Sequence, residues 1–318
     1  MRPIRLLVLL SAFFLSGCYK SPEKLFAKAN ELVLNGAYTD AIVLYNKALG
    51  KRPDYAAALN NRGMAREKRG DVPEAAQDYA LAIKADPSFA QAYNNLAALE
   101  LDRDRYPQAE KLADRAVSIA PKYVLAYVNR GSARYGQGNM AGAAQDFSHA
   151  LKLEPDFPQA LYGRALSLGG QGDNRAALQD LDRLLDIKSG MYAAWRLRGI
   201  IRETDGDFGG AAQDYGRLIS LRPDSYDGWF LRARAAWRAG YYDGAAEDIN
   251  RAMRLAQMNA AVYALRGDIY ANIDPFEAGR SYVAARTLDP QNAPIYNVKV
   301  LIMKKNLERN MPSARNRK

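Results

Sequence analysis

Seven positions of this 318-residue chain are spaced by 34 residues, and five of them are proline. They are Pro53, Pro87, Pro121, Pro155, Ser189, Pro223 and Gln257. A fixed period of this length indicates a repeat architecture, in which each unit buries its apolar face only by stacking on a neighbour. The period therefore predicts a stacked array of similar units rather than one large core.

Small residues recur with the same period. When the prolines are placed at position 32 of each unit, position 8 is always small: Ala29, Gly63, Ala97, Gly131, Ala165, Gly199, Ala233 and Gly267. Position 20 is alanine from Ala41 to Ala245, and Ala278 takes this place in the last unit after a one-residue shortening. Only small side chains let two helices approach to about 8–10 Å. The pattern therefore predicts two closely packed helices per unit.

Glycine and proline mark the expected helix ends. Glycine at position 15 predicts a left-handed residue at the end of the first helix, in Gly36, Gly70, Gly138, Gly172, Gly206 and Gly240. Pro73, Pro107 and Pro275 predict the start of the second helix, where a missing N–H costs little. Together these residues resemble the tetratricopeptide repeat motif, a helix pair in each 34 residues. The resemblance covers residues 22–293, and it implies an all-α solenoid of about eight repeats that binds other proteins.

The pattern changes after Pro294. Ile295, Val298, Leu301, Ile302 and Leu307 then recur at helical spacing. We expect residues 294–310 to form a C-terminal capping helix, with these residues on an inner face that covers the last repeat. Residues 311–318 have no periodicity and are expected to form a basic, disordered tail.

The N-terminus has the features of an export signal. A short basic lead precedes ten apolar residues, Leu6 to Leu15, which are too few for a membrane span of about 20 residues but are typical of a secretory signal. Leu15-Ser16-Gly17-Cys18 resembles a bacterial lipobox. That resemblance implies that residues 1–17 are a cleaved signal peptide, that Cys18 is lipidated, and that residues 18–21 are a short tether.

The same resemblance bears on location. Tyr19 rather than Asp follows the cysteine, which implies sorting to the outer membrane, with the protein facing the periplasm. The alternative for Cys18 is a buried core thiol, but nothing between Cys18 and Pro22 is suited to form a core. We therefore expect Cys18 to be a lipidation site.

The net charge of +10 is concentrated at the C-terminus. Residues 299–318 carry seven basic side chains and one acidic one, and the repeats are nearly neutral. Two interpretations stay open for this tail: a solubilising end, or a contact with anionic lipid headgroups. No stripe of aromatic and basic residues is apparent, so nucleic acid is not expected as a partner.

An arginine and an aspartate vary together among the repeats. Position 7 is Arg and position 23 is Asp in five of them: Arg62 and Asp78, Arg130 and Asp146, Arg164 and Asp180, Arg198 and Asp214, Arg232 and Asp248. Repeat three loses both, with Leu96 and Leu112 in their places. Because a guanidinium can grip a carboxylate with two bonds, we predict structural ion pairs, either within a repeat or across the next interface. A ligand-binding ladder is the alternative.

The family resemblance also implies a concave groove lined by positions 2, 5, 6, 9, 12 and 13 of the first helices. Two groups of candidates follow: Asn60, Asn61, Asn94, Asn95 and Asn129 in repeats two to four, and Tyr135, Tyr162, Arg196, Phe230, Arg234 and Trp237 in repeats four to seven. Asparagine can both donate to and accept from an extended peptide backbone. Aromatic residues with arginine are typical of interface hot spots.

Catalytic signals are missing from the sequence. His149 is the only histidine and Cys18 the only cysteine, so no zinc site is expected. No nucleophile triad or phosphate-binding glycine loop is present either. We expect no enzyme activity, no cofactor and no metal. The expected function is a membrane-anchored scaffold or adaptor for protein or peptide partners, such as envelope enzymes. The alternative is a pilotin-like lipoprotein that assembles a pilus or secretin.

Overall fold

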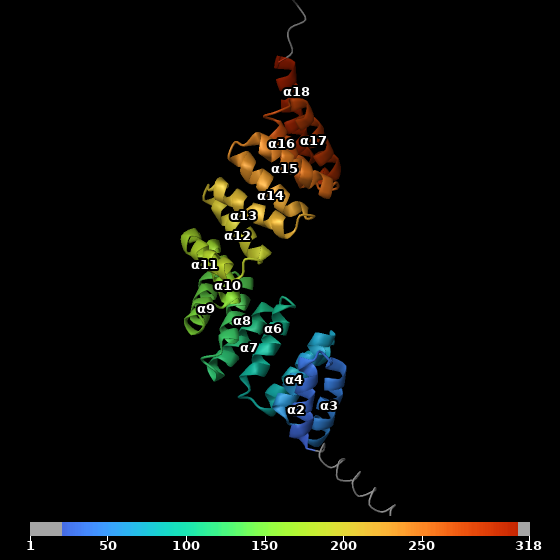
Figure 1. The fold of residues 1–318 in the computed structure, drawn as a ribbon, viewed down its shortest axis with the longest axis vertical. Helices are drawn as coiled ribbons and strands as arrows, with labels where there is room; N and C mark the ends of the chain where they lie inside the picture. Colours follow the sequence, from blue (N-terminus) through green and yellow to red (C-terminus); the bar gives the residue numbers. More distant parts are fainter. Residues whose placement is uncertain (1–20, 311–318) are drawn as a thin grey trace, which may run out of the picture. The chain divides into compact units, whose positions relative to one another are not determined.

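The computed structural model describes residues 21–310, which form seventeen α-helices and one 3-10 helix with no strand among them. The chain divides into two compact units, one ending at Gln171 and one beginning at Gly172 (Figure 1). The predicted all-α fold class is confirmed. The predicted signal peptide, Cys18 and the 311–318 tail lie outside the described residues and stay predictions.

Unit 1 contains the helices of repeats one to four and the first helix of repeat five. They are α2 (Pro22–Leu34), α3 (Tyr38–Lys51), α4 (Ala56–Arg69), α5 (Val72–Ala85), α6 (Ala90–Leu101), α7 (Tyr106–Ile119), α8 (Val124–Gly136), α9 (Met140–Leu153) and α10 (Pro158–Gly170). Even-numbered helices are the first of each repeat. Each contacts the first helix of the next repeat, so the first helices line one continuous side of the unit.

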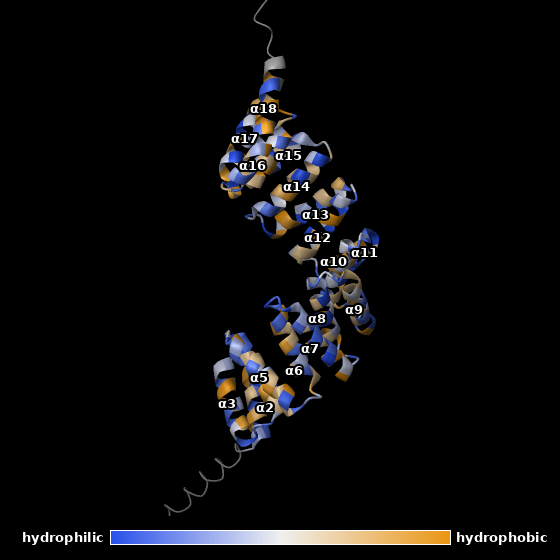
Figure 2. Ribbon diagram, turned by 180° about the vertical axis from the view of Figure 1, so that it is seen from behind, coloured by the Kyte–Doolittle hydropathy of each residue, from blue (hydrophilic) through white to orange (hydrophobic). Residues whose placement is uncertain are grey.

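Unit 2 continues the same alternation and ends in a longer helix. It contains α11 (Asn174–Ile187), α12 (Tyr192–Thr204), α13 (Phe208–Leu221), α14 (Tyr226–Arg238), α15 (Tyr242–Leu255), α16 (Ala260–Tyr270), α17 (Pro275–Leu288), η1 (Pro290–Asn292) and α18 (Ala293–Asn310). Hydrophobic and hydrophilic residues alternate within each helix (Figure 2), as expected where one face of a helix packs and the other meets water.

Close helix packing follows from the small residues at positions 8 and 20. The alanines at both positions are fully buried. Where position 8 is glycine, an aromatic side chain at position 24 occupies the space: a Cβ added to Gly199 would lie 2.5 Å from Cε1 of Tyr215. Where position 8 is Ala233, position 24 is the smaller Ile249. From repeat two to repeat eight the packing therefore alternates between these two pairings, whereas repeat one combines Ala29 with Tyr45.

The turns follow the predicted chemistry. All six glycines at position 15 have a positive φ, between 74° and 95°. In repeat three this position is Asp104, which adopts the left-handed conformation at φ 56° and accepts a hydrogen bond from the Tyr106 hydroxyl. Aspartate is one of the few residues that tolerate this region, so the helix can end without glycine. Pro73, Pro107 and Pro275 lie in the first turn of their helices, as predicted.

The periodic residues of α18 are not on its inner face. Ile295, Val298, Leu301 and Ile302 are 57%, 59%, 54% and 47% exposed. Among the α18 side chains that the structure describes, Tyr296 and Met303 are the buried ones, and Met303 packs against α17 residues of the last repeat. The prediction for the inner face was therefore wrong, apart from Leu307, which lies beside α17. Because α18 is apolar on two sides, its periodicity did not identify which side packs.

The buried tyrosine of repeat one gives the fold a pH dependence. Tyr45 is fully buried in the unit 1 core, and its hydroxyl donates to Oδ1 of Asn30 at 2.6 Å. Burial raises the pKa of Tyr45 from 10.0 to about 12. The neutral phenol is therefore favoured in the folded state over a wider pH range than in the unfolded chain.

We expect unit 1 to lose stability at high pH. Below pH 10 Tyr45 is protonated in both states, whereas between pH 10 and about 12 only the unfolded chain releases the proton. Stability then falls by roughly 1.4 kcal/mol per pH unit for this group. Urea denaturation at pH 8 and pH 11 measures the loss. Tyr45→Phe should lose less stability than the native chain over this range, and an equal loss in both would contradict the assignment.

Candidate binding surfaces

Asparagines on the first helices of unit 1 form hydrogen bonds across repeat boundaries. The bonds run from Nδ2 of Asn61, Asn95 and Asn129 to Oδ1 of Asn30, Asn60 and Asn94, over 3.0, 2.9 and 2.9 Å respectively. Each bond joins one repeat to the one before it. The structure thus brings the five predicted asparagines together with Asn30, which sequence analysis missed although it lies in the same helix series.

These bonds leave part of the asparagine row open. Asn60 and Asn94 are buried, whereas Asn95 and Asn129 are half-buried. Among the described residues, no donor reaches Oδ1 of Asn95 or Asn129. Their side chains are held in place by the Nδ2 bonds, so these two acceptors are oriented before any partner arrives.

The corresponding side of unit 2 centres on a buried carboxylate. Glu203 accepts from Nε and Nη2 of Arg234 at 2.9 and 2.8 Å, and from the Tyr215 hydroxyl at 2.9 Å. Arg238 adds an ion pair at 3.2 Å. Burial, then the charge of Glu203, raise the pKa of Tyr215, so the phenol stays a donor. Arg234 was predicted to contact a partner, but both its bonds are made within the protein.

The other groove candidates are partly committed to packing. Phe230 and Trp237 are half-buried and lie against the core of α14 to α16. Arg196 is half-exposed, and its Nε lies 3.6 Å from the Asp227 carboxylate. Tyr135 on α8 and Tyr162 on α10 are half-buried. Each of these side chains therefore offers only part of its surface to a partner.

The predicted arginine–aspartate pairs form within a repeat. In four repeats the guanidinium at position 7 lies 2.5–2.7 Å from the carboxylate at position 23. The pairs are Arg62 and Asp78 (2.5 Å), Arg130 and Asp146 (2.7 Å), Arg198 and Asp214 (2.6 Å), and Arg232 and Asp248 (2.7 Å). All four carboxylates are buried. In these four pairs the arginine therefore binds the aspartate of its own repeat and not that of the next repeat.

The fifth pair belongs to two units. Arg164 lies in unit 1, where its Nη1 donates to Oγ of Ser148 at 3.3 Å, and Asp180 is a buried residue of unit 2. In repeat eight, where serine replaces the aspartate, Arg266 donates to Oγ of Ser281 at 2.6 Å and to Glu277 at 3.1 Å. The arginine therefore keeps a partner when the aspartate is absent.

A second arginine shares three of these carboxylates. Arg66, Arg134 and Arg202 lie at position 11 of alternate repeats and bind Asp78, Asp146 and Asp214 at 2.8, 2.9 and 3.0 Å. Each of the three aspartates is thus held between two guanidinium groups. Sequence analysis missed this second arginine, although its spacing of twice the repeat length was a detectable signal.

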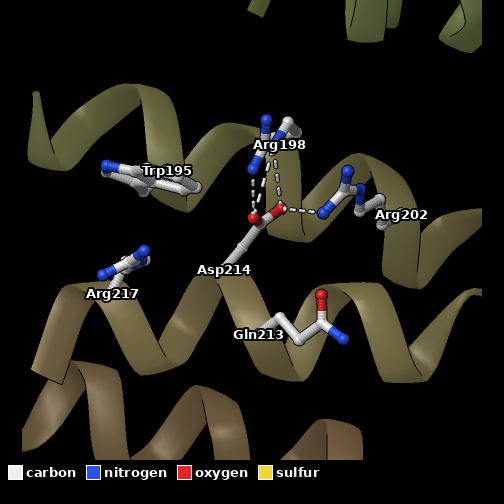
Figure 3. A pocket seen from close by; sticks show the side chains of 6 residues that line it. All are labelled: Trp195, Arg198, Arg202, Gln213, Asp214 and Arg217. Atoms are coloured by element: carbon white, nitrogen blue, oxygen red, sulfur yellow. Dashed lines mark hydrogen bonds and ion pairs between the residues drawn. The ribbon is translucent and has the colours of Figure 1, made fainter. Parts of the chain in front are cut away.

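Beside one of these pairs lies a pocket of about 490 Å³, lined by Trp195, Arg198 and Arg202 of α12 and by Gln213, Asp214 and Arg217 of α13 (Figure 3). Cζ of Arg198 lies 4.6 Å from the centre of the Trp195 ring, and Cζ of Arg217 lies 5.9 Å from it. The indole N–H donates to the carbonyl of Ser189 at 2.7 Å, which fixes the ring. Arg217 is exposed, and it forms no ion pair with any residue between 21 and 310.

The same arrangement recurs in the next repeat. The Trp229 ring lies 5.3 Å from Cζ of Arg232 and 6.0 Å from Cζ of Arg251. In unit 1 the matching positions hold Tyr127 and His149, whose rings stack at 4.4 Å. Aromatic and basic side chains therefore pack together at this position in two consecutive repeats of unit 2, a grouping that sequence analysis did not identify. Its members come from two helices per repeat, so no run of sequence shows it. The absence of a nucleic-acid partner stays a prediction.

The described residues offer neither a metal-binding cluster nor a membrane-spanning helix. No group of three or more His, Cys, Asp or Glu side chains within residues 21–310 is arranged to hold a metal ion. None of the helices that the structure describes has both the length and the apolar character that a membrane span requires.

Comparison with known proteins settles the family. The model of the tetratricopeptide repeat family matches residues 26–88, 82–124, 128–191, 162–226 and 202–260, which is most of the chain. The chain belongs to the tetratricopeptide repeat family. The family predicted from the sequence is thereby confirmed, and with it a fold that is typical of protein–protein interaction. No curated protein matches the chain.

Solved structures share the tetratricopeptide fold at low identity. PilF of Pseudomonas aeruginosa matches with a TM-score of 0.61 and 20% identity, over 67% of this chain and 97% of PilF. A tetratricopeptide repeat protein of Parabacteroides merdae matches with a TM-score of 0.55 and 21% identity, over 78% and 98%. YrrB, described as having an unusual peptide-binding site, matches with a TM-score of 0.52 and 18% identity, over 59% of this chain and 96% of YrrB.

Proposed function

We propose that this tetratricopeptide protein is a membrane-anchored scaffold of the cell envelope that binds protein or peptide partners along its first helices. The observation that carries the proposal is the asparagine row of unit 1. Oδ1 of Asn95 and of Asn129 each has no donor among the described residues, while Nδ2 of the same side chain is bonded to the preceding repeat. Two oriented acceptors in successive repeats suit a backbone that offers N–H groups.

This arrangement favours binding of an extended peptide segment, whatever its amino-acid sequence. A backbone N–H is offered by every residue except proline, so recognition through asparagine depends little on the partner's side chains. Exposed apolar groups on the same helices, such as Met64 and Leu125, supply surface for packing beside the row. We propose enzymes of the cell envelope as the partners that the scaffold holds.

Photo-crosslinking in cells tests where partners bind. A crosslinking residue at Met64 of α4 is expected to capture a partner, because Met64 lies next to Asn60 on the first-helix side. Leu81, on the second helix α5, is the matched control, since it is 47% exposed and Met64 is 43% exposed. Capture of the same proteins from both positions would contradict binding along the first helices.

A double substitution tests the asparagine row itself. Asn95→Ala with Asn129→Ala removes both open acceptors, and the yield of the Met64 crosslink is expected to fall at least ~5-fold, since each lost hydrogen bond costs about 0.5–1.5 kcal/mol. Asn174→Ala is the control, because Asn174 bonds to Asp205 in unit 2 and lies off these helices. An unchanged crosslink in the double variant would mean that the row does not bind the partner.

The anchor is proposed from the lipobox-like sequence at Cys18. Cells grown with an alkyne-tagged palmitate should label the native chain, and Cys18→Ser should abolish the label and release the protein from the outer-membrane fraction. Two or more acyl chains are enough for stable anchoring, whereas one is marginal. Equal membrane retention of Cys18→Ser, without the label, would show that something else holds the protein there.

The alternative is an assembly lipoprotein for a pilus or secretin system. The observation that favours this alternative is the fold shared with PilF of Pseudomonas aeruginosa. A shared fold does not distinguish an assembly factor from an adaptor. The crosslink at Met64 does distinguish them. A captured hydrolase or protease supports the adaptor, and a captured secretin or pilin subunit supports assembly.

A further inference from the structure

The last helix carries an apolar stripe that no described residue of unit 2 covers. Ile295, Val298, Leu301 and Ile302 lie on the side of α18 that faces away from α17, and each is about half exposed or more. They span two turns of one helix. Tyr296 and Met303, on the opposite side, supply the contacts that hold α18 to the array.

This stripe is unusual for the end of a repeat array. Terminal helices of such arrays generally present a polar outer face, because no further repeat covers them. Contiguous exposed apolar side chains generally mark a surface that binds a protein or a membrane. The opposite side of α18 already packs against α17 through Met303, so the last repeat is covered without the stripe.

The charges beside the stripe are basic. Lys304 and Lys305 are exposed, and Lys305 follows Val298 by seven residues and Ile302 by three, so it lies on the same face. Lys299 forms an ion pair with Asp268 at 2.5 Å, so its charge is already neutralised within the protein. Within the sequence from 299 to 318, seven basic residues accompany one acidic residue. An apolar face bordered by lysines is the composition of helices that lie in a membrane interface.

We propose that α18 binds the surface of a membrane that contains anionic lipids. Ile295, Val298, Leu301 and Ile302 enter the headgroup region, and Lys304 and Lys305 lie against lipid phosphates. The contact adds a second attachment at the C-terminal end of unit 2. It goes beyond the proposed scaffold function and does not depend on lipidation of Cys18.

A second copy of the chain fits this stripe less well. A stable protein interface buries about 800 Å² on each partner and involves 20–30 residues a side, far more than four side chains supply. In a parallel pair of α18 helices, Lys305 would also face its own copy, which like charges oppose. A lipid surface requires neither a large complementary area nor an acidic partner helix.

Vesicle binding by the unacylated chain tests the proposal. Residues 19–318 hold every described helix and leave out the apolar leader, which would itself bind lipid. This protein is expected to sediment with vesicles of equal parts phosphatidylglycerol and phosphatidylcholine. Val298→Ser with Ile302→Ser is expected to weaken binding at least ~10-fold, because inserted apolar carbons drive the partition. Lys304→Glu with Lys305→Glu should remove the preference for phosphatidylglycerol over pure phosphatidylcholine.

Matched controls separate the stripe from general hydrophobicity. Ile187→Ser with Leu221→Ser removes two comparably exposed aliphatic side chains from α11 and α13, and binding should stay unchanged. Three results would overturn the proposal. They are no binding by the native sequence, full binding by Val298→Ser with Ile302→Ser, which would assign lipid contact to the tail alone, and a dimer in light scattering that this double variant abolishes.

Discussion

Replacing Asp214 with alanine is expected to lower the free energy of unfolding of unit 2 by about 3–5 kcal/mol, because it leaves two arginines without their buried partner. The Asp214 side chain is 1% exposed and lies between the guanidinium groups of Arg198 and Arg202, at 2.6 and 3.0 Å. Both of its oxygens accept hydrogen bonds from these arginines, so the variant loses all of these contacts at once. The effect should be larger than for any exposed ion pair of the array.

Asp182→Ala is the matched control, because Asp182 binds the same Arg198 at 2.7 Å but is 54% exposed. Its loss is expected to cost less than about 1 kcal/mol. Repeat arrays need not unfold in one step, so urea denaturation should be combined with hydrogen exchange of α12 and α13. Equal losses in the two variants would contradict a special role for the buried aspartate.

Gly199→Ala is expected to destabilise unit 2 by about 1–3 kcal/mol through overpacking. The added Cβ would lie 2.5 Å from Cε1 of Tyr215, a buried ring that cannot move without disturbing its bond to Glu203. The loss should appear although alanine is a better helix former than glycine by roughly 1 kcal/mol. Gly279→Ala is the control, since no atom lies within 4 Å of its added Cβ, and it should be neutral or stabilising.

The alternation between repeats supplies a rescue for Gly199→Ala. Repeat seven combines Ala233 with Ile249, so Gly199→Ala with Tyr215→Ile copies that pairing into repeat six. Tyr215→Ile alone should destabilise by leaving a cavity and removing one donor from Glu203. The double variant should lose less than the sum of the two single variants by more than ~0.5 kcal/mol. Additive losses would mean that the two positions do not constrain each other.

The interior of each repeat could be predicted from the sequence. Small residues at positions 8 and 20, glycine at position 15 and proline near the start of the second helix all occur in the structure as expected. Each repeat contacts mainly its neighbours in the chain, so a local pattern carries the packing of the whole array. Repeat three shows the same logic, because Asp104 takes the left-handed position that glycine holds elsewhere.

Pairing of Arg62 with Asp78 and its equivalents was also predicted, because both residues disappear together in repeat three. The sequence did not predict whether the arginine binds the aspartate of its own repeat or of the next one. Both contacts would make the two positions vary together in the same way. Bond geometry decided it: the two positions lie on the two helices of one repeat, and the guanidinium meets the carboxylate there. The asparagine row needed structure for the same reason, as its bonds join different repeats.

The amino-acid sequence by itself determined the repeat length, the helix pairs, the turn residues and the family, because these depend on patterns within 34 residues. Tertiary structure alone decided which side of α18 packs, that Trp195 and Trp229 each lie beside two arginines, and which acceptors of Asn95 and Asn129 stay open. These features depend on side chains that meet from separate helices. A helix that is apolar on two sides has a periodicity that fits either face, and only packing against α17 selects one.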